Sequence, residues 1–135
     1  MELSNVITKV PAVSRDTVIK DLVELMIKHK MDLFPVVEND SVIGVVSEKD
    51  LMKVMKVQPV TGMRAVLIKD IPKDIRKRKV SDIMTSHPIT ARATDSVSGV
   101  INLMIANNMK RIIIVNENRK LVALVQFRDL LKKIL

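Results

Sequence analysis

An internal repeat constrains the fold of this chain more than any other feature of its sequence. One segment runs from Pro11 to Met55 and a second from Thr90 to Leu135, and matched residues lie 78 or 79 positions apart. Self-similarity at a fixed spacing indicates duplication of one unit, here of about sixty residues, in which each copy completes the core of the other. The matched phrases are Asp16-Thr17-Val18 with Asp95-Ser96-Val97, Leu25-Met26 with Leu103-Met104, and Val45-Val46-Ser47-Glu48-Lys49-Asp50 with Leu124-Val125-Gln126-Phe127-Arg128-Asp129.

Each copy predicts the same order of elements. A short strand is followed by a helix, which Asp16 or Thr17 can cap in the first copy and Asp95 or Ser96 in the second. Two short apolar runs then predict strands buried on both faces and joined by a turn-rich hairpin, and a second helix follows. The expected strands are residues 33–37, 42–46, 111–115 and 121–125, and the closing helices are residues 48–56 and 127–135.

These patterns predict an α/β (α+β) fold in which two βαββα units pack as a pseudo-twofold pair. We expect the first unit at residues 1–57, a linker at 58–79 and the second unit at 80–135, with one short strand of the linker at 65–68. Apolar residues at helical spacing predict the buried face of the first helix of each unit. They are Ile19, Leu22, Val23, Met26 and Ile27 in the first unit, and Val97, Val100, Ile101, Met104 and Ile105 in the second.

Composition narrows the classes of function. The chain has no cysteine, which excludes disulfide scaffolds, thiol catalysis and zinc ribbons. Phe34 and Phe127 are its only aromatic residues, so an RNA-binding surface built on base stacking is disfavoured. The net charge of +8 favours anionic partners such as nucleotides, nucleic acids or acidic protein surfaces. There is no signal-peptide pattern and no apolar run near the roughly 18 residues of a membrane span, so we expect a cytoplasmic protein without a membrane partner.

The two segments resemble CBS domains, a family named for cystathionine β-synthase. In the second copy, Val80-Ser81-Asp82-Ile83-Met84 resembles the opening phrase of the family and Pro88-Ile89-Thr90 its first strand. In the first copy, Phe34-Pro35-Val36-Val37 and Gly44-Val45-Val46-Ser47-Glu48-Lys49-Asp50 are similar to the family, although residues 1–10 lack the opening phrase. Two such sets in series, in the right order, make the resemblance fairly specific.

The resemblance implies a pair of CBS units packed through their sheets, with clefts between them that take AMP, ADP, ATP or S-adenosylmethionine. Such pairs usually associate further, so we expect a homodimer. They perform no chemistry, and ligand binding changes the state of a partner protein. We therefore expect a standalone regulatory module, not an enzyme, with no cofactor beyond its adenine-containing ligand and a regulated protein that the sequence does not identify.

The resemblance also implies a ribose-binding motif of the form Gly-apolar-apolar-Ser/Thr-x-x-Asp, in which the carboxylate accepts hydrogen bonds from the ribose hydroxyls. The motif is complete from Gly44 to Asp50, but Ser47 and Asp50 also fit a capping box that opens a helix. In the second copy Ala123 and Gln126 replace the glycine and the serine, while Asp129 remains. Because glutamine is a poor N-cap, the capping explanation does not extend to Asp129.

Basic residues distinguish the two predicted sites, because a phosphate needs cations. Lys110-Arg111 directly precedes an expected strand, whereas the matching residues of the first copy are Asp32-Leu33. A solvated helix end, where cations suit the dipole, is the alternative reading of Lys110-Arg111. We predict a phosphorylated-ligand site and a weaker site for a less anionic ligand. The first contains Thr90, Lys110, Arg111, Gln126 and Asp129, and the second contains Pro11, Ser47 and Asp50.

The run Arg76-Lys77-Arg78-Lys79 is the densest group of charges. It fits a solvated face, an entrance to the second site that holds a β- or γ-phosphate, or a nucleic-acid patch. Two alternatives to the nucleotide sensor therefore stay open, namely a nucleic-acid-binding protein and a ligand-free dimerisation module. His29 and His87 lack the spacing of metal ligands, and no nucleophile–base pair or glycine-rich phosphate loop is present. We predict no catalytic residue and no metal site.

Overall fold

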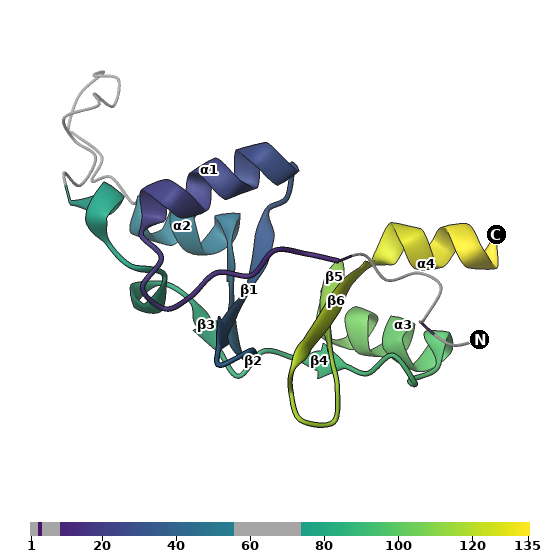
Figure 1. Cartoon of the computed structure of the whole chain (residues 1–135). Helices are drawn as coiled ribbons and strands as arrows, with labels where there is room; N and C mark the ends of the chain where they lie inside the picture. Colours follow the sequence, from purple (N-terminus) through teal and green to yellow (C-terminus); the bar gives the residue numbers. More distant parts are fainter. Residues whose placement is uncertain (1–2, 4–8, 56–73) are drawn as a thin grey trace, which may run out of the picture.

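The computed structural model describes residue 3, residues 9–55 and residues 74–135, and it contains two sheets with their helices. Figure 1 shows the two sheets next to each other, with α1 and α2 against the first and α3 and α4 beside the second. This mixed arrangement of two repeated units confirms the predicted fold class. The strand expected at residues 65–68 lies outside the described residues. No helix in the described part of the chain is long and apolar enough to cross a membrane.

The first sheet has the strand order β1-β2-β3, and the pairs β1–β2 and β2–β3 are antiparallel. Its third strand comes from the start of the second unit, so the two halves of the sequence are interwoven. A parallel bridge between Val13 and Val36 adds the short opening strand that the repeat predicts. The elements of this half are α1 (Ile19–His29), β1 (Leu33–Glu38), β2 (Ser41–Ser47), α2 (Glu48–Val54) and β3 (Thr85–Ser86).

The second sheet has the order β4-β5-β6, in which β4 is parallel to β5 and β5 is antiparallel to β6. The parallel pair Ala91–Ile114 matches the bridge Val13–Val36, since both of its residues lie 78 positions later. The predicted strand 111–115 is confirmed without change. The elements are β4 (Thr90–Ala91), α3 (Val97–Ala106), β5 (Arg111–Val115), β6 (Leu121–Gln126) and α4 (Phe127–Ile134).

The central strands are buried on both faces because one face packs on helices and the other on the opposite sheet. In β5, Ile112 and Ile114 belong to the core shared with α3 and α4. Their neighbour Ile113 belongs to a second core, which also contains Val42 of β2. Side chains of a strand alternate between its faces, so this assignment follows from the pleat. The continuous apolar runs of the sequence therefore reflect a sheet-on-sheet junction between the units.

Two backbone hydrogen bonds join the hairpins of the two units. The N–H of Val42 donates to the carbonyl of Arg119 at 2.9 Å, and the N–H of Leu121 donates to the carbonyl of Asp40 at 3.1 Å. Residues 40 and 42 correspond to residues 119 and 121, because 40 + 79 = 119 and 42 + 79 = 121. Each bond is therefore the counterpart of the other, and the pair relates the two units by a pseudo-twofold axis.

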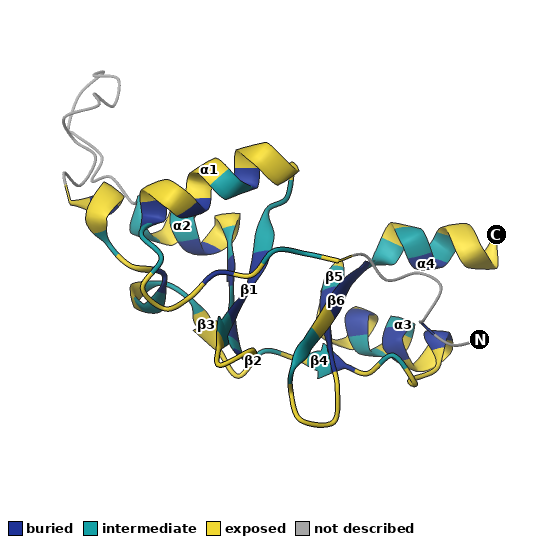
Figure 2. Ribbon diagram, in the orientation of Figure 1, coloured by how far each residue is buried: buried dark blue, intermediate teal, exposed yellow. Residues whose placement is uncertain are grey.

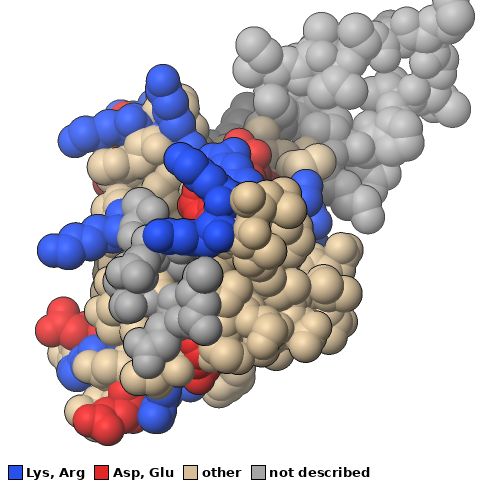
Figure 3. All heavy atoms as spheres, turned by 90° about the vertical axis from the view of Figure 1, so that its right-hand side faces the viewer, with Lys and Arg blue, Asp and Glu red and all other residues tan. Residues whose placement is uncertain are grey.

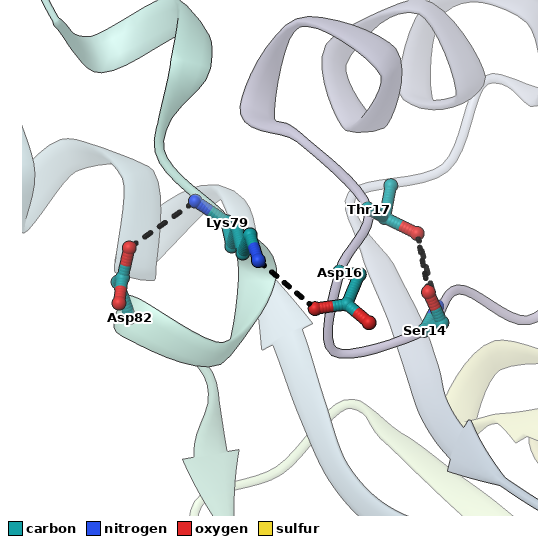
Figure 4. Close-up of polar contacts among 5 residues, drawn as sticks. All are labelled: Ser14, Asp16, Thr17, Lys79 and Asp82. Atoms are coloured by element: carbon teal, nitrogen blue, oxygen red, sulfur yellow. Dashed lines mark hydrogen bonds and ion pairs between the residues drawn. The ribbon is translucent and has the colours of Figure 1, made fainter.

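The predicted cap of α1 is wrong. The N-cap residue is Val18, and no side chain caps this helix. The carboxylate of Asp16 instead pairs with Lys79, with Oδ1 and Nζ 3.2 Å apart, and Thr17 bonds to Ser14 (Figure 4). The backbone N–H of Ile19, which has no acceptor within the helix, donates to the carbonyl of Arg78 at 2.8 Å. The backbone before the second unit therefore caps this end of α1. In α3 the predicted cap is confirmed, because Ser96 Oγ accepts from the N–H of Gly99.

The buried stripes of α1 and α3 are narrower than the sequence predicts. Ile27 is 73% exposed and Ile105 is 66% exposed, and Val23 is 36% exposed (Figure 2). Each first helix lies over a small sheet, so only a narrow face of it reaches the core. The buried positions are Ile19, Leu22, Met26, Val97, Val100 and Met104, while Ile101 is half-buried.

Candidate functional site

The first candidate group lies at the start of α2, where Ser47 and Asp50 form a complete capping box. Asp50 Oδ2 accepts from the backbone N–H of Ser47 at 2.9 Å and from its hydroxyl at 3.1 Å, and the N–H of Asp50 donates to Ser47 Oγ at 3.4 Å. Asp50 is 7% exposed. The capping alternative is therefore present in the structure, and it uses one carboxylate oxygen of Asp50.

Thr85 brings a residue of the second unit to this group. Its hydroxyl lies 3.5 Å from the other carboxylate oxygen of Asp50, Oδ1. Thr85 is in β3, which pairs with β2 of the first unit, so the opening phrase of one unit contributes to the site of the other. Thr85 was not among the predicted site residues, because the candidates were grouped within each copy of the repeat. The useful signal was its position directly after the opening phrase, which ends at Met84.

Gly44 of the same motif has a packing role. A Cβ atom added to it would lie 2.8 Å from the carbonyl oxygen of Thr85 and 3.2 Å from Met84 Sδ. Glycine therefore allows β3 to approach β2 closely. The matching residue of the second unit is Ala123, which is buried in β6.

Asp129 is the counterpart of Asp50 in α4. The N-cap residue Gln126 makes no side-chain cap bond, which confirms that no capping box forms here. Asp129 is half-buried in the first turn of the helix, where a carboxylate suits the helix dipole. The expected role of Asp129 as a ribose ligand stays a prediction.

Two adjoining hollows lie where the units meet, and they share Arg111, Gln126 and Arg128. We call the first, of about 300 Å³, the junction hollow, and the second, of about 210 Å³, the α4 hollow. The predicted residues Lys110, Arg111 and Gln126 thus come together in the α4 hollow. The junction hollow is lined by Met26, Lys30, Met31, Asp32, Glu48, Arg111, Gln126 and Arg128.

Both units supply charged side chains to these hollows. Lys30 and Arg128 were not among the predicted site residues, although Arg128 lies next to Asp129 in the repeated phrase. Figure 3 shows Lys and Arg side chains projecting together from the upper half of one face of the molecule, with acidic groups between and below them. Cations gathered in a concave surface favour an anionic ligand.

Arg111 is held by an acid of the first unit. Its Nη2 atom lies 2.9 Å from Asp32 Oδ1 and 3.0 Å from Asp32 Oδ2. Only the contact with Oδ2 has the donor–acceptor geometry of a hydrogen bond. The side chain of Arg111 is 29% exposed and that of Asp32 is 37% exposed. Within the described residues, no donor is placed to make a hydrogen bond to Asp32 Oδ1. Oδ1 is buried, so within the same residues the ion pair with Arg111 compensates its charge.

The remaining predicted residues lie elsewhere. Thr90 pairs with Ile113 at the middle of β5, whereas Arg111 is at the start of that strand. Thr90 lines a separate hollow that also contains Arg92 and Arg119, so the structure does not place it beside Lys110 and Arg111. Pro11 is half-buried, in the segment before the Val13 bridge.

The basic run lies beside the start of α1, away from these hollows. Arg76 and Lys77 are exposed in the 3-10 helix η3 (Ile75–Lys77). Lys79 directly precedes a second 3-10 helix, η4 (Val80–Asp82). Its side chain pairs with Asp16, and its backbone N–H donates to the carboxylate of Asp82 (Figure 4). None of its residues lines the junction hollow or the α4 hollow. Across the described ranges, no group of three or more His, Cys, Asp or Glu residues is placed to hold a metal ion.

A scan against known families matches residues 3–57 and residues 80–135 separately to the CBS domain. The chain belongs to the CBS domain family. The two matches cover both predicted copies, and the interwoven sheets show how the two CBS domains pack as a pair.

Relatives of known sequence include two proteins of Methanocaldococcus jannaschii. The uncharacterized protein MJ1426 is 25% identical, and the alignment covers all of this chain and 92% of that protein. An inosine-5'-monophosphate dehydrogenase is also 25% identical, but the alignment covers 95% of this chain and only 22% of that enzyme. The likeness to the dehydrogenase thus lies in its CBS region, and this chain spans about a fifth of its length.

Solved structures with the same fold include two that contain adenine compounds. The CBS domain pair of MJ0100, in complex with 5'-methylthioadenosine and S-adenosyl-L-methionine, has a TM-score of 0.75 and 20% identity over 99% of this chain and 95% of that one. CBSX2, in complex with AMP, has a TM-score of 0.79 and 20% identity over 98% of this chain and 95% of that one, and it comes from Arabidopsis thaliana.

Proposed function

We propose that this chain is a regulatory module that binds an adenine nucleotide, or S-adenosylmethionine, between its two CBS domains and passes the effect of binding to a partner protein. One observation carries the proposal. Lys110, Arg111, Gln126 and Arg128 meet in a hollow beside the junction of two domains whose fold is that of proteins solved with AMP and with S-adenosyl-L-methionine.

The chemistry of the hollows supports a phosphorylated ligand at the second domain. The guanidinium groups of Arg111 and Arg128 offer paired N–H donors, which match the geometry of phosphate oxygens. Asp129 lies in the first turn of α4 directly after Arg128, so a ribose bound by Asp129 would place its phosphate near these cations. The junction hollow is at the lower bound of small-molecule sites in volume, and the adjoining α4 hollow is smaller than that bound.

A second, weaker site is proposed around Asp50. Its Oδ2 is engaged by the capping box, so only Oδ1, which faces Thr85, is available to a ribose hydroxyl. Among the residues that the structure describes, neither Lys nor Arg is part of this hydrogen-bonded group. A ligand with little negative charge suits this site better than a nucleoside triphosphate.

In this proposal the chain performs no chemistry itself. Ligand binding between the domains favours the arrangement that contacts the ligand best, and that shift in population is the signal. The junction is suited to this role because the domains are joined by a small sheet-on-sheet core and by two symmetrical backbone bonds at the hairpins.

We also propose that two copies associate through their helices. Ile27 of α1 and Ile105 of α3 are matched positions, since 27 + 78 = 105, and both are largely exposed. Met52 of α2 is 72% exposed and Ile134 of α4 is 52% exposed. Large apolar side chains on all four helices are costly in water, and a second copy with the same surface would bury them.

Calorimetric titration of the full chain tests the proposed function. AMP, ADP, ATP and S-adenosylmethionine are each titrated to millimolar concentration, and the chain with Arg111→Gln serves as the control. We expect saturable heat with at least one ligand, and a weaker response from the variant for a phosphorylated one. The absence of both heat and thermal stabilisation with all four ligands contradicts the proposal.

A further inference from the structure

The contact between Asp32 and Arg111 links the two domains at the junction hollow. Asp32 directly precedes β1 of the first domain, and Arg111 is the first residue of β5 in the second. Both side chains line the junction hollow, and Arg111 also lines the α4 hollow. An anionic ligand that reaches Arg111 therefore meets the carboxylate of Asp32 as well.

Asp32 occupies the position that holds a cation in the other domain. The N–H of Glu48 donates to the carbonyl of Asp32 at 2.9 Å, and the N–H of Phe127 donates to the carbonyl of Lys110 at 2.8 Å. These bonds are counterparts, because 32 + 78 = 110 and 48 + 79 = 127. The same backbone site thus presents a carboxylate in the first domain and an ammonium group in the second.

The charges that line the junction hollow are nearly balanced because of this acid. Its cations are Lys30, Arg111 and Arg128, and its anions are Asp32 and Glu48. At pH 7 the described residues of the lining therefore carry a formal net charge of +1, and they would carry +2 without Asp32. The cations attract every phosphate, and Asp32 repels each phosphate that lies beside it, so Asp32 reduces what a second or third phosphate would gain.

We propose that Asp32 sets the charge selectivity of this site, so that it takes an adenosine monophosphate in preference to the triphosphate. Asp32 acts in two ways, by engaging the guanidinium group of Arg111 and by adding a negative charge beside it. The inference rests on the proposed function, because it concerns the same nucleotide site. It goes further by naming the residue that decides how many phosphates the site accepts.

Competition between AMP and ATP tests the inference in the full chain. The two dissociation constants are measured by calorimetry for the wild type, for Asp32→Asn and for the control Asp40→Asn. Asp40 lies in the turn at the far end of β1, so the control removes the same charge from a distant position. Asparagine tolerates the backbone of residue 40, where φ is 66°. Thermal unfolding of each variant checks that the fold is retained.

For the wild type we expect tighter binding of AMP than of ATP. In Asp32→Asn the ratio of the ATP to the AMP dissociation constant falls by about tenfold, because a charge within a few ångströms of the phosphates is removed. Asp40→Asn leaves the ratio unchanged within about twofold, since exposed charges at a distance are screened. An equal ratio in all three proteins, or a wild type that prefers ATP, overturns the inference while leaving the proposed function intact. If no protein binds either nucleotide, the inference fails, and the proposed function fails with it only if ADP and S-adenosylmethionine give no response either.

Discussion

A Cβ atom added to Gly44 would lie 2.8 Å from the carbonyl oxygen of Thr85, so the close approach of β3 to β2 depends on the absence of a side chain at residue 44. We predict that Gly44→Ala lowers the free energy of unfolding by about 1–3 kcal/mol, since the backbone of β3 must shift. Chemical denaturation measures the change.

Gly99→Ala is the matched control for this prediction. A Cβ atom at Gly99 meets only the side-chain oxygen of Ser96, at 2.9 Å, and residue 99 lies within α3. Alanine favours a helix over glycine by about 1 kcal/mol, but the cap oxygen of Ser96 must move aside, so the two effects offset and we expect little net change in stability. Equal destabilisation by both variants would show that the contact between β2 and β3 is not the cause.

The capping box of Asp50 has no counterpart at Asp129, so the two acids should differ in their effect on stability. We predict that Asp50→Ala costs about 1–2 kcal/mol of stability, because the backbone N–H and the hydroxyl of Ser47 lose the carboxylate that accepts from them. Asp129→Ala should cost about 0.5 kcal/mol or less, since it loses only a favourable position near the helix dipole. Denaturant titration of the two variants compares these costs directly.

The same two variants should rank in the opposite order when nucleotide binding is measured. We predict that Asp129→Ala weakens the binding of AMP more than Asp50→Ala does, because Asp129 belongs to the domain that carries Lys110 and Arg111. Calorimetry on the two folded variants gives the ranking. A larger loss of affinity in Asp50→Ala would assign the phosphorylated ligand to the other site.

The basic residues beside α1 should not take part in nucleotide binding. Arg76 and Lys77 are exposed and line neither hollow, so the double change Arg76→Gln and Lys77→Gln should leave the dissociation constant of AMP within about twofold. Arg111→Gln, which removes the same kind of charge from the hollow, should weaken binding by about tenfold or more. Salt-dependent binding of DNA or RNA that the double change abolishes would instead favour a nucleic-acid partner.

A substitution at the exposed Ile27 tests the proposed association of two copies. We predict that Ile27→Glu, which puts a charge on the exposed face of α1, shifts the chain toward the monomer because the charge would be buried at the interface. Light scattering after size-exclusion chromatography measures the mass. Asn118→Glu adds the same charge to the exposed turn after β5 and should leave the mass unchanged. A wild-type chain that is monomeric at high concentration contradicts the prediction.

The strands were the most predictable part of the fold, because their apolar runs are short, doubly buried and bounded by turns. The segment 111–115 matched without change, and β1, β2 and β6 differ from the prediction by one or two end residues. The cap of α1 was not predictable. Asp16 and Thr17 have the residue types that usually cap a helix, but Asp16 forms an ion pair with Lys79 and Thr17 accepts a hydrogen bond from Ser14. Lys79 lies 63 residues away from Asp16, and such a contact depends on the packing of the whole fold.

The candidate site was predictable in its residue types but only partly in its grouping. The duplicated motif identified Asp50, Asp129 and the pair Lys110-Arg111 as candidates, since their chemistry is visible in the sequence. Pairing across the junction was not visible, because Thr85 reaches the acid of the first domain and Asp32 reaches the arginine of the second. A repeat reveals which residues are equivalent, whereas the pseudo-twofold axis decides which of them meet.

A crystal structure of the chain grown with AMP tests the central claim most directly. The account predicts a nucleotide between the CBS domains, with its phosphate within hydrogen-bond distance of Arg111 and its ribose hydroxyls at Asp129. Displacement of the Asp32 carboxylate from Arg111 should accompany binding. A nucleotide bound beside Arg76 and Lys77, or an empty junction at millimolar AMP, would contradict the account.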